Sequence, residues 1–283
     1  MLMDTLQKIE NIEELILPSM IGNKLIKRIV ATQMFTNPFA GEKLHIMIVG
    51  NVASGKSTLG LEVLDILPNS SYCGKKTTPV GLIEKLISSN GSILIFDELD
   101  KVDKEVREQL LECMQSGHIS YDKFQYHRRH QAKVNILALC NPKGYTLSED
   151  MNLLSQVNFG LPLLSRFHMV LPIYQIDPSY YPEIAVKMLT KQQDDERKEK
   201  LRRYITAVKK QIPYIEIDEN ITRNVGVYIE ELKLSSPMSE IISPRAIEGM
   251  ISFIKANARM NLKTKADMED FTEVKNIYDK IFY

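Results

Sequence analysis

Apolar residues along the first 177 positions occur in short continuous runs that alternate with helical spacing. Short runs predict buried strands, and recurrence every three or four residues predicts helices. The predicted strands are His45–Val49, Ile93–Phe96, Val134–Leu139 and Met169–Tyr174. The predicted helices between them are Leu59–Leu67, Gly81–Ser88 and one that stops at Gly117. This alternation favours a mostly parallel sheet with helices on both faces.

The pattern changes near Asp177–Pro178, and only helical spacing follows. Ser243-Pro244 is a typical helix start, with the serine as the cap and the proline in the first turn. We predict an α/β core over residues 1–177 and a small helical domain over residues 178–283. The helices expected in the second part cover about residues 182–190, 194–211, 219–234, 244–261 and 267–281.

Composition and charge narrow the function classes. The 36 basic residues balance 36 acidic ones, whereas a protein that coats nucleic acid with its whole surface is usually basic, so we expect any such contact to be local. Three cysteines without C-x-x-C spacing indicate reduced thiols. No apolar stretch reaches the ~20 residues that a bilayer span requires, and the first residues do not resemble a signal peptide. We expect a cytoplasmic protein without a membrane partner.

A phosphate-binding motif follows the first predicted strand and opens the next predicted helix, which is the context that such a motif requires. Backbone N–H groups and the helix N-terminus would surround the phosphates of ATP. Lys56 would reach the β- and γ-phosphates, and the Ser57 hydroxyl would coordinate Mg²⁺. The predicted nucleotide site comprises Gly50, Asn51, Val52, Ala53, Ser54, Gly55, Lys56, Ser57 and the adjoining Thr58.

Two acids end the second predicted strand, where they would be costly without a cation. We predict that Asp97 holds Mg²⁺ through water and that Glu98 polarises the water that attacks ATP. Asn141 ends the third strand, where its amide could orient that water or touch the γ-phosphate. Because Asn-Pro is also a common start of turns, the alternative that Asn141 only begins a turn stays open.

At this point the chain resembles a known family, the AAA+ ATPase module of the minichromosome maintenance (MCM) replicative helicases. The resemblance covers nearly the whole chain, and the Leu-Leu-Ser-Arg-Phe stretch and the C-terminal helices carry it most specifically. The similar stretches are Leu17–Gly22, Phe96–Lys101, Leu147–Leu153, Leu161–Phe167, Leu201–Ile205, Ile242–Glu248 and Ala256–Met260.

The resemblance implies a P-loop AAA+ αβα sandwich followed by an all-α lid, and it implies roles at matching positions. Ile21 would lie beside the adenine, and Asn141 would be the sensor 1 residue. Arg166 would be an arginine finger that enters the ATP site of the neighbouring subunit, and Arg245 would be the sensor 2 residue, also acting in trans. The alternative for both arginines is a surface salt bridge. A finger that works in trans implies a closed ring, and the family implies a hexamer.

The segment His118–Lys133 is the candidate DNA element. We predict two strands, Ile119–Tyr121 and Ala132–Leu139, joined by a loop over Phe124–Gln131. Basic side chains interleaved with aromatic ones suit phosphate contact and base stacking. The segment is similar to the family's pre-sensor 1 hairpin, and a solvated basic hairpin is the alternative. The predicted DNA contacts are Lys123, Tyr126, Arg128 and Arg129.

Departures from the family keep a second function open. The family's extra hairpin insertion has no counterpart between Gly81–Ser89 and Ile93, the N-terminal DNA-binding half of the family has none either, and Gly55 and His168 stand where alanine and aspartate are usual. We therefore expect a motor of MCM type acting on DNA, with a possible loader or replication partner. The alternative is an AAA+ protein remodeller of the MoxR or chelatase type without DNA dependence.

Overall fold

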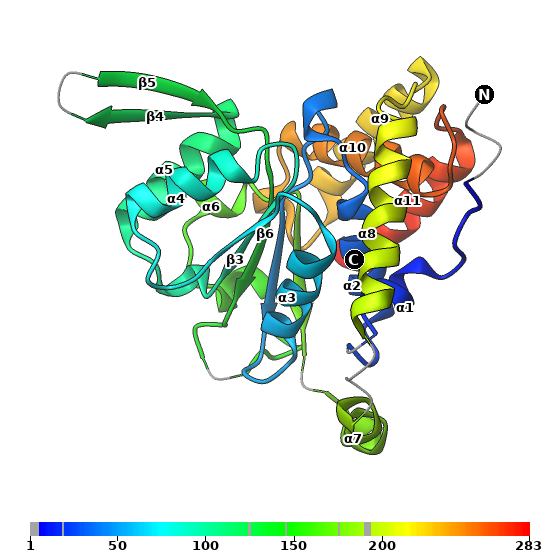
Figure 1. Cartoon of the computed structure of the whole chain (residues 1–283), viewed down its shortest axis with the longest axis horizontal. Coiled ribbons are helices and arrows are strands. Elements are labelled where there is room, and N and C mark those ends of the chain that lie inside the picture. Colours follow the sequence, from blue (N-terminus) through cyan, green and yellow to red (C-terminus); the bar gives the residue numbers. More distant parts are fainter. Residues whose placement is uncertain (1–5, 19, 124–125, 145, 175, 190–193) are drawn as a thin grey trace.

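The computed structural model of the protein describes residues 6–18, 20–123, 126–144, 146–174, 176–189 and 194–283; of residues 120–123, 126–129, 187–189 and 194 it describes the backbone alone. A five-stranded parallel sheet stands at the centre of the α/β part (Figure 1). Its strand order is β2-β3-β6-β1-β7. The strands are β1 (Ile46–Gly50), β2 (Ser71–Cys73), β3 (Ile93–Asp97), β6 (Asn135–Cys140) and β7 (Met169–Ile173).

Four of these strands lie where the apolar runs predict them, because strands covered on both faces need apolar side chains at consecutive positions. β1 and β6 are buried at each residue. β2 was not predicted, since its three residues are too few to show a period. Among the described strands β7 pairs with β1 alone, so Pro172 lies in an edge strand, which fits the missing backbone N–H of proline.

Helices cover both sides of the sheet, which confirms the predicted sandwich. Figure 1 shows α4 and α5 on one side, with α1, α2 and the C-terminal helices on the other. α5 ends at Gly117, which adopts φ of 66° as expected of a helix C-cap. The helices of this part are α1 (Ile12–Ile16), α2 (Lys24–Met34), α3 (Lys56–Ile66), α4 (Pro79–Ser88), α5 (Lys104–Ser116) and α6 (Leu161–Leu164).

The C-terminal part is helical, as predicted. Its helices are α7 (Tyr181–Leu189), α8 (Asp194–Gln211), α9 (Glu219–Ser235), α10 (Arg245–Met260) and α11 (Met268–Phe282). The capping role expected of Ser243 is wrong, because its Oγ is buried and, among the described residues, has no hydrogen-bond partner. In the described part of the chain no helix is long and apolar enough to cross a bilayer.

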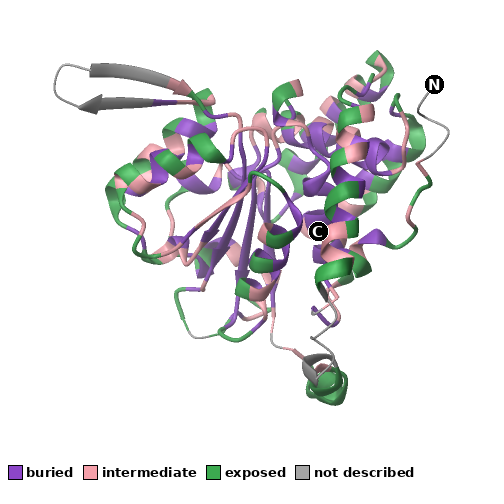
Figure 2. Ribbon diagram, viewed as in Figure 1, coloured by how far each residue is buried: buried purple, intermediate pink, exposed green. Residues whose placement is uncertain are grey.

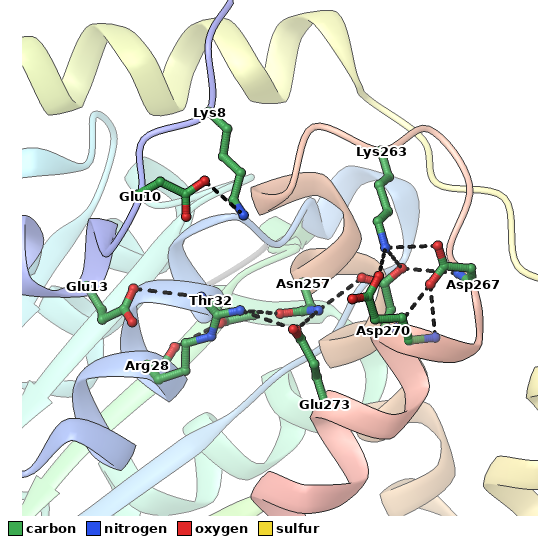
Figure 3. Close-up of polar contacts among 11 residues, drawn as sticks. Lys8, Glu10, Glu13, Arg28, Thr32, Asn257, Lys263, Asp267, Asp270 and Glu273 are labelled. Carbon is green, nitrogen blue, oxygen red and sulfur yellow. Dashed lines mark hydrogen bonds and ion pairs between the residues drawn. The ribbon is translucent and has the colours of Figure 1, made fainter.

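The N-terminal helices pack on the C-terminal ones, and buried residues continue from the sheet into that bundle (Figure 2). A polar chain ties α2 to α10 and α11 (Figure 3). Arg28 Nη2 donates to Asn257 Oδ1 at 2.7 Å, and Asn257 Nδ2 donates to Asp270 Oδ1 at 3.0 Å and to Glu273 Oε2 at 2.8 Å. The division of the chain at residue 177 stays a prediction.

A buried ion pair reinforces the same junction. The side chains of Arg259 and Glu42 are 0% and 2% exposed, and two N–H···O bonds of 2.6 Å join them. Arg259 also donates to the carbonyl oxygens of Ile212 and Phe35, both at 2.7 Å. The guanidinium therefore links the C-terminal end of α10 to the segments that follow α2 and α8.

We expect Arg259→Met to lower the free energy of unfolding by about 3–5 kcal/mol, because it leaves the buried Glu42 carboxylate without its ion-pair partner. Chemical denaturation followed by circular dichroism measures this. The control is Arg223→Met, which removes an arginine that is 73% exposed and pairs with Glu219 on one helix face. That change should cost no more than about 0.5 kcal/mol. Equal losses of unfolding free energy in the two variants would contradict a stabilising role of the Arg259–Glu42 pair.

Candidate active site

The predicted catalytic segments meet at one edge of the sheet. The phosphate loop follows β1, Asp97 ends β3, and Asn141 follows β6. In the sheet β6 lies between β3 and β1, with Asp97 opposite Leu139 and Cys140 opposite Val49. Since the strands are parallel, their carboxyl ends share one edge, which is where open α/β sheets bind ligands.

The loop between β1 and α3 has the backbone of a phosphate cradle. Gly55 adopts φ of 85° and caps α3, and Ala53 adopts φ of 63°. A Cβ at Gly50 would lie 2.9 Å from Ser54 Oγ and 3.0 Å from Ile173 Cβ, so this position requires glycine. The first turn of α3 then presents free N–H groups at the loop, as anion sites at helix N-termini do.

Lys56 points back into this loop. Its Nζ donates to the carbonyl oxygens of Gly50 and Asn51, both at 2.7 Å, and its side chain is buried. Burial lowers the pKa of Lys56, and the nearby Asp97 charge opposes that shift. No carboxylate in the described part of the chain forms an ion pair with this ammonium. A buried cation that lacks a direct counter-ion, beside a helix N-terminus, fits a phosphate group.

Asn51 connects the loop to two neighbouring segments through hydrogen bonds. Its N–H donates to the Ile173 carbonyl oxygen at 3.3 Å, and its Oδ1 accepts from the Leu147 N–H at 2.6 Å. The loop is thereby fixed to the end of β7 and to the segment after β6. The other predicted loop residues are Ser54, which is buried, Gly55 and Thr58, which are half-buried, and Val52, Ala53 and Ser57, which are exposed.

Asp97 is held by hydrogen bonds to both of its carboxylate oxygens. Oδ1 accepts from the Glu98 N–H at 3.0 Å, and Oδ2 accepts from the Tyr72 hydroxyl at 2.5 Å. Tyr72 belongs to β2, the strand that the sequence pattern did not predict, so no sequence signal pointed to it. Burial raises the pKa of the Tyr72 phenol, the hydrogen bond to Asp97 adds to this rise, and the neighbouring Ser57 hydroxyl opposes it.

Glu98 adopts φ of 54°, a left-handed conformation that is uncommon outside glycine and clusters at functional sites. Its carboxylate pairs with Lys101 and lies 3.7 Å from Lys75 Nζ. The hydrogen bond from Lys101 is the main reason that the pKa of Glu98 is lowered. The carboxylate is therefore ionised at neutral pH, as a residue that polarises water must be.

Asn141 is half-buried at the end of β6, between the loop and the acids. Its backbone N–H donates to Asp100 Oδ1 at 3.1 Å, which fixes the peptide after the strand. The position therefore lies between the phosphate loop and Asp97 on the shared edge of the sheet. Ile21 is buried, and its predicted place beside adenine stays a prediction.

Arg166 and Arg245 lie at the other edge of the sheet. Arg166 precedes β7, and α10 packs there so closely that a Cβ at Gly249 would lie 2.3 Å from His168 Cδ2. Each strand residue advances the chain by about 3.3 Å, so the five-residue strands separate the two edges by roughly 15 Å. The two arginines therefore lie away from the phosphate loop of their own chain.

The Arg245 guanidinium is close enough for its charge to act on Arg166. Burial lowers the pKa of Arg166, and the charge of Arg245 lowers it further. Arg166 Nη2 donates to Gln115 Oε1 at 2.6 Å, while its buried Nε has no hydrogen-bond partner among the described residues. Within the same part of the chain neither arginine forms an ion pair, so the alternative of a surface salt bridge finds no support.

The candidate DNA element is an antiparallel hairpin of β4 (His118–Lys123) and β5 (Tyr126–Gln131), which projects beyond the helices in Figure 1. The predicted pairing was wrong, because the residues taken as the loop form the second strand. The run YHRRHQ has no apolar alternation, but backbone groups pair whatever the side chains. The structure describes no side chain of the predicted DNA contacts Lys123, Tyr126, Arg128 and Arg129.

Comparison with known proteins agrees with this geometry. A family model described as "MCM P-loop domain" matches residues 1–192. DNA replication licensing factor mcm6 of Dictyostelium discoideum is 25% identical over 96% of this chain and 35% of its own length. Minichromosome maintenance protein MCM of Saccharolobus solfataricus is 26% identical over 93% of this chain and 43% of its own length.

The chain spans less than half the length of these curated relatives. The family match nevertheless includes the phosphate loop, Asp97, Glu98, Asn141 and Arg166, and it covers more than half of the chain. The sequence motifs, the parallel sheet between layers of helices and the family match thus lead to the same conclusion. The chain belongs to the MCM P-loop domain family of AAA+ ATPases.

Proposed function

We propose that this protein hydrolyses ATP to ADP and phosphate as a subunit of an MCM-type motor that acts on DNA. The observation that carries the proposal is the place of Lys56. Its ammonium is buried among loop carbonyls at the same sheet edge as Asp97, without a carboxylate paired to it in the described residues. ATP would supply the missing negative charge, since a triphosphate can replace the loop carbonyls as the partner of the ammonium.

The residues at this edge of the sheet would have different roles in ATP binding and hydrolysis. Ser57 and Asp97 would hold Mg²⁺, and this ion, when bound, neutralises charge on the phosphate oxygens. Lys56 would bind the β- and γ-phosphates together with the N–H groups of the loop. Glu98 would polarise the attacking water, and Asn141 would orient it. The ion pairs of Glu98 with Lys75 and Lys101 favour the ionised form of its carboxylate, which is the form that polarises water.

Arg166 and Arg245 would complete the ATP site of a neighbouring subunit. Their distance from the phosphate loop of their own chain supports action in trans, because only a second copy can place these groups beside a γ-phosphate. Two adjacent cations without an acidic partner among the described residues form a receptor for an anion. Burial also lowers the pKa of the neighbouring His168 to about 3, so this histidine is neutral and does not compete with the arginines for an anion. Head-to-tail contacts of this kind form a ring when the rotation between subunits closes, and we propose a closed hexamer.

DNA is the proposed substrate of the motor because the relative from Dictyostelium discoideum carries the name DNA replication licensing factor mcm6 and because a hairpin projects from the core. The hairpin sequence places two histidines, two arginines and a tyrosine within Tyr126–His130. A protein of zero net charge needs such a local basic element to hold a phosphate backbone. A loader or replication partner would be required to place a closed ring on DNA.

Arg128→Ala/Arg129→Ala is expected to weaken single-stranded DNA binding at least tenfold at low salt. Losing two phosphate contacts should reduce the slope of log affinity against log salt by about 1.4. Fluorescence anisotropy with labelled single-stranded DNA between 50 and 200 mM salt measures both quantities. Arg202→Ala/Arg203→Ala removes another adjacent arginine pair, on α8, and should leave both values unchanged.

The ATPase rate with and without single-stranded, forked and duplex DNA separates the two candidate functions. A motor on DNA should hydrolyse ATP faster when DNA is present, and the hairpin variant should lose that stimulation. A rate that ignores all three DNAs at low salt but rises with a protein client would instead support a remodeller of the MoxR or chelatase type.

A further inference from the structure

The phenol of Tyr72 holds one oxygen of the carboxylate that we assign to the magnesium site. Its hydroxyl donates to Asp97 Oδ2 at 2.5 Å, while the Glu98 N–H donates to Oδ1 at 3.0 Å. A carboxylate offers about four acceptor positions on two oxygens. Among the described residues only these two bonds reach Asp97, so about two acceptor positions stay free, and the two bonds fix the direction in which they point.

Tyr72 is itself held by three neighbouring elements, β3, α3 and α4. The register of β2 and β3 pairs Tyr72 with Ile95, and Asp97 is two residues further along β3 on the same face of the sheet. The ring also contacts α3, where a Cβ at Gly60 would lie 3.5 Å from Tyr72 Cε2. The backbone carbonyl oxygen of Tyr72 accepts a hydrogen bond from Lys85 Nζ on α4.

The hydroxyl that bonds to Asp97 also lies near Ser57, the other side chain that we assign to Mg²⁺. α3 begins with Lys56 and Ser57, and Ser57 is close enough to Tyr72 to influence its ionisation. One phenol oxygen is thus next to the hydroxyl on the helix and the carboxylate on the strand. Neither of these side chains bonds to the other directly, so their relative placement depends on what lies between β2, β3 and α3.

We infer that Tyr72 is a positioning residue for Mg²⁺ binding, which acts by fixing the rotamer of Asp97 toward Ser57. The inference rests on the proposed function, because it assigns the partner of a magnesium ligand in that same site. Partners of this kind orient metal ligands, and their loss typically reduces metal affinity about 10- to 100-fold. Tyr72 does not touch the phosphates in this assignment, so nucleotide binding without metal should not depend on its hydroxyl.

The test is Tyr72→Phe, which removes the hydroxyl and keeps the ring that packs on Gly60. Binding of a fluorescent ATP analogue is followed while Mg²⁺ is titrated, and again in excess chelator. We expect the Mg²⁺ concentration for half-maximal enhancement of binding to rise about 10- to 100-fold. Affinity in chelator should stay unchanged, and the maximal ATPase rate should return at high Mg²⁺.

Tyr228→Phe is a matched control, because the Tyr228 hydroxyl donates to Asp279 Oδ1 at 2.6 Å in the helical part of the chain. It removes the same chemical group and a tyrosine–aspartate bond of similar length, and its Mg²⁺ titration should equal that of the wild type. A loss of affinity shared by both variants would show a general effect of stability and overturn the inference.

A double-variant cycle keeps the test independent of folding. In an Asp97→Ala background, Tyr72→Phe should have no further effect on the Mg²⁺ titration, since the carboxylate that Tyr72 positions is absent. Additive effects, or a Tyr72→Phe titration equal to that of the wild type, would overturn the inference while leaving the proposed ATPase intact. A wild-type protein that binds no ATP analogue with Mg²⁺ would overturn both.

Discussion

Lys56→Ala is expected to weaken ATP binding by about 2–5 kcal/mol, which is roughly 30-fold to several-thousandfold in Kd. The ammonium is buried within the loop, where a triphosphate can replace the carbonyl oxygens of Gly50 and Asn51 as its partner. Its removal leaves the triphosphate without its main cation from this chain. Isothermal titration calorimetry with ATP and Mg²⁺ measures the loss.

Two control variants test whether the loss of ATP affinity is specific to Lys56. Glu98→Gln leaves the loop unchanged and should bind ATP as the wild type does while hydrolysis is lost, because the amide cannot polarise water as a carboxylate can. Lys104→Ala removes a lysine whose side chain is 85% exposed and should change neither property. A Lys56→Ala protein with the ATP affinity of the wild type would contradict the site. A Glu98→Gln protein with unchanged turnover would instead indicate that Glu98 has no role in hydrolysis.

Arg166→Ala is expected to lower the ATPase rate by about 10³-fold or more with little change in ATP affinity. An arginine finger acts on charge that develops in the transition state, and such fingers are worth about 10³- to 10⁵-fold in turnover. The side chain lies at the sheet edge opposite its own phosphate loop, so each subunit should still bind ATP by itself. Steady-state turnover and calorimetric affinity on the same preparation separate the two effects.

A mixing experiment tests whether Arg166 acts in trans. Arg166→Ala subunits retain a complete phosphate loop, and Lys56→Ala subunits retain the arginine. In a mixed ring, some interfaces combine the intact loop of one copy with the intact arginine of the next, so part of the activity should return. If mixtures at any ratio stay as inactive as each variant alone, the arginine does not serve a neighbouring site. Gln115→Ala, which removes the partner of Arg166 Nη2, should reduce the rate far less.

Tertiary context decided the elements that the apolar pattern could not predict. β2 and β5 carry either too few residues or too many charged ones to show a period of two, and they form because backbone N–H and C=O groups pair with a neighbouring strand. Tyr72 shows the consequence, since its contact with Asp97 exists only because β2 joins the edge of the sheet beside β3. The charge clusters of the hairpin were visible in the sequence, but the strand pairing was not.

The sequence by itself determined the phosphate loop, the acids after the second strand and the positions of most helices, because these depend on local spacing. A glycine-rich turn between a strand and a helix specifies its backbone conformation with few residues, and a buried strand or an amphipathic helix needs a fixed apolar period. The same local motifs carried the resemblance to the MCM family, which the family match confirmed.

Only the tertiary structure decided which of these segments become neighbours. The strand order β3-β6-β1 brings Asp97 and Asn141 beside Lys56, and the packing of α10 on His168 brings Arg245 beside Arg166 at the opposite edge. Such contacts join residues about 40 to 80 positions apart, and they arise from the burial of whole strand and helix faces. Apolar burial is non-directional, and the sequence around a polar residue does not show which distant residue will lie beside it. The residues of the site could therefore be identified from the sequence, but their proximity could not.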